Sequence, residues 1–182
     1  ASTDDIVREA AISKGLLFHY FESKLGVYAF VYDYSVRYMT LELSTVMDIK
    51  ETEPFELLKQ QEEARMHAMR GYPYMQQFLN RAQSEDVGEV LVATESKRAI
   101  LEAEYARLES QIRYMGFPSG VDGRKLYKML DYTIKGLMTE RFMEGAFQPE
   151  MLYKEITEYL DMMKLLVTKQ GGSSYRSGIE IM

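Results

Sequence analysis

The sequence predicts an all-α protein of about eight helices, in which a short helix-turn-helix head precedes a larger multi-helix body. Only 4 prolines and 12 glycines occur among 182 residues, and most of them cluster at a few points. The long stretches between these clusters repeat apolar residues at steps of three and four, which is the period of an α-helix. No alternating apolar and polar run is bounded by turn residues on both sides, so no strand is predicted.

The head begins with two short helices separated by a break. Thr3 is placed to cap the first helix, and Ser13 to cap a second helix over residues 14–21, because hydroxyl side chains accept hydrogen bonds from the free amides of a first turn. Residues 11–13 interrupt the periodicity between the two helices. The second helix is expected to turn three apolar side chains inward, namely Leu17, Phe18 and Phe21.

The body begins with a long helix from about Lys24, whose apolar repeat consists of Val27, Phe30, Val31, Tyr34, Tyr38 and Leu41. Pro54 suits the first turn of the next helix, which runs to Gly71, and a shorter helix follows Pro73. Another long helix is predicted from about Glu85 to a loop over residues 116–120. Apolar steps over 126–138 and 152–166 predict two further helices, and residues 171–182 are predicted to form a flexible tail.

Composition narrows the class of function. The chain has no cysteine and only two histidines, so disulfides, thiolate metal sites and cysteine nucleophiles are excluded, and no metal or other cofactor is predicted. No catalytic triad is recognisable, and the paired carboxylates are interpreted as solvated surface, so an enzyme is not expected. The absence of a long apolar run and of a signal peptide predicts a cytoplasmic protein without membrane contact. The net charge of −6 argues against a protein that coats nucleic acid nonspecifically.

Two short helices joined by a tight turn and followed by a longer helix form a helix-turn-helix pattern. Four residues stand at the N-terminus of its second helix: Ser13, Lys14, Gly15 and Leu16. A lysine can donate to guanine edges or phosphates, a leucine can touch a thymine methyl, and a glycine lets the backbone approach DNA closely. Three further residues are placed to grip phosphates: His19, Tyr20 and Lys24.

The string IVREAAISKGLLFHYFESK, from Ile6 to Lys24, is more specific than a generic helix-turn-helix. It resembles the DNA-binding signature of the tetracycline-repressor (TetR-like) family, an I-A-x-x-A-G-V-S-x-G core followed by L-Y-x-H/Y-F-x-S-K. The resemblance implies a dimeric repressor that binds a palindromic DNA operator and is released by a small-molecule effector. It also implies that Thr3 contacts phosphate or caps its helix, that residues 13–16 form the recognition end, and that His19, Tyr20 and Lys24 anchor the DNA backbone.

Three departures from the signature affect the expected head. Ala11 stands where the family has glycine, and an alanine in the left-handed conformation there would cost about 1 kcal/mol. Phe18 stands where the family has tyrosine and so lacks a hydroxyl that could reach phosphate. The family also has a helix before this motif, so the head, residues 1–26, is expected to be N-terminally incomplete. Residues 27–170 are then the effector-binding and dimerisation domain.

The body is expected to hold the effector and the dimer contact. Abundant methionine (13) and tyrosine (14) suit an adaptable pocket for an apolar or aromatic molecule, with Met66, Met69, Tyr72, Tyr74, Met75, Phe78, Tyr105 and Met115 as candidates. The resemblance implies that the last two helices pair with those of a second chain, through Leu126, Leu130, Thr133, Leu137, Leu152, Ile156, Tyr159 and Met163. For both sets the alternative is ordinary packing within one chain.

Two other functional interpretations stay open at this point. A non-catalytic helical dimer or protein-interaction module would explain the body and make the Ser13–Lys24 string a coincidence. An activator of the same family would share every feature of the head, because the residues do not set the sign of regulation.

Overall fold

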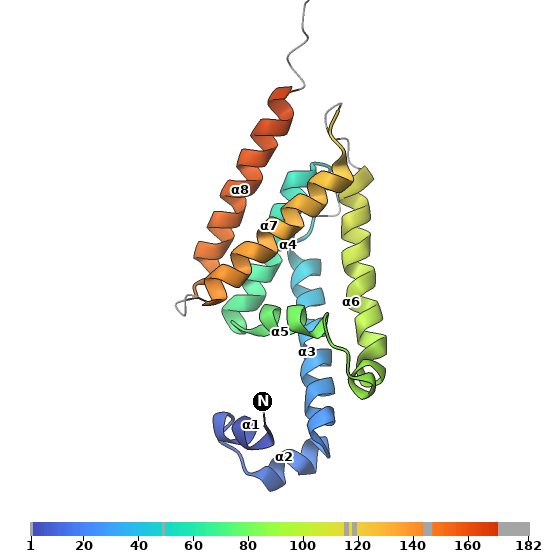
Figure 1. Cartoon of the computed structure of the whole chain (residues 1–182), viewed down its shortest axis with the longest axis vertical. Coiled ribbons are helices and arrows are strands. Elements are labelled where there is room, and N and C mark those ends of the chain that lie inside the picture. The colour runs from blue at the N-terminus through green and yellow to red at the C-terminus, as the bar shows by residue number, and fades with distance from the viewer. Residues whose placement is uncertain (1, 49, 115–116, 118–119, 144–146, 171–182) are drawn as a thin grey trace, which may run out of the picture.

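The computed structural model describes residues 2–48, 50–114, 117, 120–143 and 147–170; Met115 and the predicted tail fall outside these ranges. Within them the chain forms eight helices and no strand, as the sequence predicts. The helices are α1 (Thr3–Glu9), α2 (Lys14–Phe21), α3 (Lys24–Val46), α4 (Pro54–Gly71), α5 (Met75–Ala82), α6 (Gly88–Tyr114), α7 (Gly123–Met143) and α8 (Pro149–Gln170). The α1–α2 head lies at one end of α3, and the remaining helices form the body (Figure 1).

Side-chain caps set the starts of the early helices. The Oγ of Ser13 accepts the amide N–H of Leu16 at 3.1 Å at the start of α2, as predicted, and Ser23 caps α3 in the same way. Pro54 occupies the first turn of α4, where its missing N–H has no cost, and Glu53 precedes it as the cap. These local signals explain why the predicted starts of α2, α3 and α4 agree with the structure.

The cap of α1 corrects one prediction. Ser2, not Thr3, is the capping residue: its Oγ accepts the amide N–H of Asp5 at 3.1 Å, and its own N–H donates to the Asp5 carboxylate at 3.0 Å. These two hydrogen bonds satisfy the backbone N–H groups of Ser2 and Asp5, which would otherwise have no partner at the start of the helix. Thr3 lies one residue too late in the chain to make the same pair of bonds. Thr3 is instead a half-buried residue in the first turn of the helix.

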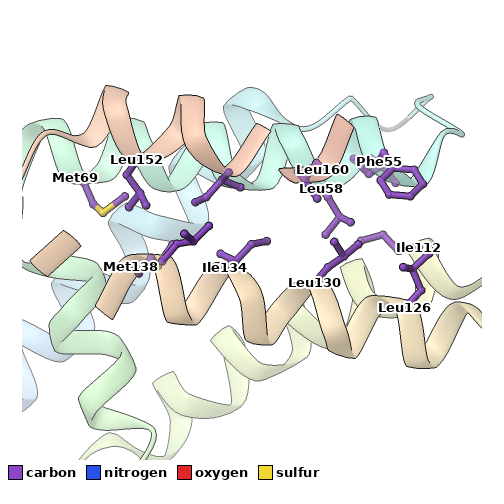
Figure 2. Packing of buried hydrophobic residues seen from close by; sticks show 13 residues of the cluster. Phe55, Leu58, Met69, Ile112, Leu126, Leu130, Ile134, Met138, Leu152 and Leu160 are labelled. Carbon is purple, nitrogen blue, oxygen red and sulfur yellow. The ribbon is translucent and has the colours of Figure 1, made fainter. Parts of the chain in front are cut away.

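The body has two packed clusters that share α4. One lies between α4, α7, α8 and the end of α6 and includes Phe55, Ile134 and Leu160 (Figure 2). The other lies between α3, α4, α5 and α6 and includes Met39 and Ala64. Because α4 contributes buried residues to both, it is the central helix of the body and its two faces are fixed by different neighbours.

The apolar repeat of α3 lies on a different face from its buried side. The buried residues are Tyr32, Ser35, Val36, Met39 and Leu43, whereas most of the repeat identified in the sequence is exposed: Phe30, Val31, Tyr34 and Leu41. Since α3 is apolar on both faces, periodicity alone does not indicate which one packs inward. Part of the exposed face lines a groove described below.

No helix among the described residues is both long enough and apolar enough to cross a membrane.

Candidate functional site

The N-terminal half of α2 presents a free surface. Leu17 is 2% exposed and lies on the inner side of α2, which packs against α1 and α3. The preceding Leu16 is 44% exposed. Ser13, Lys14 and Gly15 are exposed as well, and a Cβ added to Gly15 would meet no atom closer than the Ser13 Oγ at 4.0 Å. The four residues predicted to form the recognition end therefore lie together on a surface that can enter a major groove.

Carboxylates of α1 pair with two of the three cations of the head. The Lys14 Nζ lies 2.8 Å from the Asp4 carboxylate, and the Arg8 guanidinium lies 2.8 Å from Asp5. Both pairs are largely exposed, so they contribute little stability and phosphate oxygens can replace the carboxylates. The third cation, Lys24, is exposed in the first turn of α3, where the positive end of the helix adds to its attraction for phosphate.

The aromatic residues of α2 divide between surface and interior. His19 and Tyr20 are exposed, and their rings meet edge to face at 5.2 Å, as suits residues that contact a DNA backbone. Phe18 was expected inside but is 38% exposed, because an eight-residue helix has a narrow inward face and Leu17 fills it. Phe21 is half-buried, with its ring 5.2 Å from that of Phe30 on α3.

Gly26 is a structural requirement of the head that the sequence analysis missed. A Cβ at this position would lie 2.0 Å from the backbone oxygen of Phe21, far inside the contact limit. Only glycine therefore allows the first turn of α3 to lie against the end of α2. A glycine in the first turn of a helix, directly after a short helix and a two-residue break, was the available signal.

Residues 1–29 match the model of the family described as bacterial regulatory proteins, tetR family. The N-terminal segment of the chain is therefore similar to the tetR family. The match coincides with α1, α2 and the first turns of α3, which form the DNA-binding region of these transcriptional regulators. Comparison with curated proteins gave no match, and comparison with solved structures gave none.

In the body, an apolar groove of about 480 Å³ lies between α3 and the α4–α5 turn. Its lining contains four of the predicted effector residues: Tyr72, Tyr74, Met75 and Phe78. The opposite wall is α3, through the exposed Phe30, Val31 and Tyr34 and the buried Ser35. The Tyr34 and Tyr72 hydroxyls lie 2.5 Å apart across the groove and share a hydrogen bond, so its main polar groups already satisfy one another.

A second hollow, of about 290 Å³, reaches from the surface into the body between α4, α5, α6 and α7; Gln83, Glu102 and Lys135 at its lining are exposed, and it is called the internal cavity below. Its lining is mainly polar and consists of Arg65, Gln76, Asn80, Gln83, Glu102, Tyr105, Ala106, Glu109, Tyr127, Asp131, Lys135 and Met138. Tyr105 is the one predicted effector residue in this lining. Met66 and Met69 are buried, and neither lines this cavity nor the apolar groove.

Most predicted dimer residues lie in the core of the chain itself. Leu126, Leu130, Leu137, Leu152 and Ile156 are buried against α4 and one another, which corresponds to the alternative of packing within one chain. Thr133 and Met163 are half-buried and Tyr159 is exposed. Besides Tyr159, the large apolar residues that α7 and α8 leave exposed are Met129, Tyr132, Met143, Met151, Met162, Leu165 and Leu166.

Among the described residues, no group of three or more histidine or carboxylate side chains is arranged to hold a metal ion.

Proposed function

We propose that this chain is a cytoplasmic, non-catalytic transcription repressor that binds a palindromic operator as a dimer. A small apolar or aromatic effector that binds the body releases it from DNA. The single observation that supports this proposal most is the recognition surface of α2, where residues 13–16 are exposed in a segment that matches the tetR family. An interaction module without DNA binding would have no need for a free helix N-terminus flanked by exposed cations.

Dimerisation follows from the geometry of DNA reading. Two recognition helices read a palindrome only when they are held about 34 Å apart. The exposed apolar side chains of α7 and α8 supply a contact for a second copy, and the exposed Gly136 on α7 allows helices to approach closely. We therefore place the dimer contact on Met129, Tyr132, Met162 and Leu166, beside the residues predicted from the sequence.

Release by the effector uses α3, which joins the head to the body. α1 packs on α2, and α2 packs on α3, whereas α3 packs on α4 and α6. A ligand that favours one arrangement of the body helices would change the tilt of α3 and move the two heads away from the operator spacing. The predicted boundary at residue 26 lies within the first turn of α3, so head and body share this helix.

The test is binding to the DNA upstream of its own gene, measured across a salt series with the protein that the gene encodes. Lys14→Ala should weaken binding by about 1–3 kcal/mol and relax the preference for the operator. Lys24→Ala should weaken binding to all sequences alike and reduce the salt slope by about one. Lys50→Ala, which removes an exposed lysine outside the head, is the control.

Binding to the palindromic fragment that is no tighter than to a scrambled fragment would refute the DNA-binding proposal. Transcription from the same promoter in a purified system then separates repressor from activator. A rise in transcript on adding the protein would favour the activator.

A further inference from the structure

The internal cavity contains buried polar atoms that the protein itself leaves without a partner. Gln76 is 4% exposed; its Nε2 donates to Asn80 Oδ1 at 2.8 Å, but its Oε1 accepts no hydrogen bond among the described residues. The Nε of Arg65, which α4 contributes to the lining, is also buried and unpartnered. A buried polar atom without a partner costs about 1–3 kcal/mol, so these atoms favour occupancy by a ligand with polar groups of its own.

The charges around the cavity leave a negative excess. Arg65 pairs with the fully buried Glu62 behind the wall, and Lys135 pairs with Asp131 at 2.8 Å, so both cations are already neutralised. Glu102 makes no ion pair or hydrogen bond within the described part of the chain and lies on the α6 wall. A ligand that enters therefore meets the Gln76 Oε1 and the Glu102 carboxylate as acceptors, which favour a positively charged donor, and the Arg65 Nε as a donor that a ligand hydroxyl or ether oxygen could satisfy.

The two tyrosines of the lining add aromatic surface. The Arg65 guanidinium lies 5.3 Å from the centre of the Tyr105 ring, so one face of this ring already holds a cation of the protein and only the rest of its surface can contact a ligand. Burial raises the pKa of Tyr127 to about 12, so its ring is neutral at physiological pH. Neutral rings beside carboxylates bind an organic cation better than an anion or a neutral molecule of equal size.

We propose that the internal cavity binds a small molecule with a protonated amine beside an aromatic or apolar body, its amine directed toward Glu102 and the Oε1 of Gln76. This inference narrows the effector of the proposed function to amine cations, and its regulatory meaning rests on that function. The binding step does not depend on DNA. The apolar groove lacks the unpartnered polar atoms that support this assignment, because the Tyr34 and Tyr72 hydroxyls bond to each other.

The test compares three probes of similar size: 2-phenylethylammonium, 2-phenylethanol and 3-phenylpropanoate. Calorimetry on the full chain without DNA should show the ammonium probe binding about tenfold more tightly than the other two. Glu102→Gln should remove most of that preference. Glu95→Gln, a change of an exposed α6 carboxylate outside the cavity lining, should leave it intact.

Gln76→Met provides a second readout that does not depend on charge. Because this change removes the unpartnered Oε1 together with the Nε2 hydrogen bond to Asn80, the two effects on stability oppose each other, and the melting temperature of the unliganded variant should stay about the same while ammonium affinity falls about fivefold. A lower melting temperature together with the lost affinity would mark Gln76 as a structural residue and count against the site.

Two results would overturn the proposal outright. One is that none of the probes binds at concentrations up to about 10 mM; the other is that the alcohol or the carboxylate binds as tightly as the ammonium. The effect of the probe on operator affinity is a separate measurement. If the ammonium probe binds the cavity and leaves operator affinity unchanged, the failure lies in the proposed function and not in the cavity.

Discussion

The turn between α1 and α2 offers a direct test of the head structure, through the substitution Ala11→Gly. Ala11 has φ = +53°, in the left-handed region, as its departure from the family signature suggested. It ends α1 in a Schellman motif: its N–H donates to the Arg8 carbonyl at 3.2 Å, and the Ile12 N–H donates to the Val7 carbonyl at 3.1 Å. These two bonds require the left-handed conformation, so the alanine is held in it.

The expected gain follows from two opposing terms. An L-residue with a Cβ pays about 1–2 kcal/mol in the left-handed conformation, which glycine does not pay. Glycine also raises the conformational entropy of the unfolded chain, which lowers the stability of the folded head by about 0.4–1 kcal/mol. The net stabilisation of the head is therefore about 1 kcal/mol, or a factor of about five in its folding equilibrium.

Hydrogen exchange is the appropriate assay, because the head packs mainly on α3 and can open without unfolding the body. Exchange of the Ile12 and Leu17 amides should slow about fivefold in Ala11→Gly. Ala10→Gly is the matched control, since Ala10 is equally exposed and has an ordinary helical φ of −79°. There glycine should speed exchange, with a cost of about 0.5–1 kcal/mol. Faster exchange in both variants would refute the left-handed assignment.

Three further predictions concern packing and charge. Gly26→Ala should destabilise the head by about 1–3 kcal/mol and abolish operator binding, since the new Cβ would lie 2.0 Å from a backbone oxygen of α2; hydrogen exchange and DNA binding measure this. Glu62→Ala should lower the free energy of unfolding by about 3–5 kcal/mol in urea, because it leaves Arg65 charged and unpaired in the interior, and changing both residues to methionine should restore most of the loss. Burial raises the pKa of Glu56, but hydrogen bonds from Lys164 and a second lysine outweigh it and hold the pKa below its ordinary value of 4.5. The stability that this carboxylate contributes is therefore complete above pH 4.5 and lost as the pH falls below it, and Lys164→Gln should flatten this part of the curve in urea unfolding between pH 7 and about pH 3.

Each of these has a control with the same chemistry. Gly15→Ala adds a Cβ into open space and should leave the head at least as stable as before. Glu63→Ala removes the neighbouring half-buried carboxylate, and a loss equal to that of Glu62→Ala would contradict the buried-pair argument. Lys154→Gln removes an exposed lysine of α8 and is the control for Lys164→Gln. If it reduced the pH dependence of the unfolding free energy equally, the argument that Lys164 lowers the pKa of Glu56 would be wrong.

Local chemistry predicted most of the fold. Ser13 and Pro54 set their helix starts through a cap and a missing N–H, and both effects can be recognised from a few neighbouring residues. The start of α6 was predicted too early, at Glu85 in place of Gly88. The Glu85 carboxylate accepts the amides of Asp86 and Val87 at 3.2 and 3.1 Å, and this turn delays the helix.

The candidate sites were predicted unevenly, for a physical reason. The recognition end of α2 is a local feature, so its residues could be named from the string alone. The face that a helix buries depends on its partners: Leu126 and Ile156 fit a dimer seam by period but pack on α4 of the same chain. The internal cavity was missed except for Tyr105, because Arg65 and Gln76 are residue types normally exposed. Glu62, which falls between Leu58 and Met66 on the buried face of this helix, three residues before Arg65, was the available hint.

The length of α3 has a mechanical consequence for how finely the body can control DNA occupancy. Its 23 residues make a rod of about 34 Å, so a rotation of about 5° at one end displaces the other by about 3 Å, close to the 3.4 Å step between base pairs. A helix of this length enlarges thermal motion of the body as much as it enlarges the motion caused by an effector. The bending stiffness of α3 therefore determines how far operator affinity differs between the effector-free and effector-bound protein. The hydroxyls of Ser35, Thr40 and Thr45 bond to backbone carbonyls one turn earlier, a pattern that bends helices, and they lie between the midpoint of α3 and its C-terminal end. We therefore expect α3 to bend most easily in this part. Alanine substitutions at these three positions should change operator occupancy although none of the three residues contacts DNA.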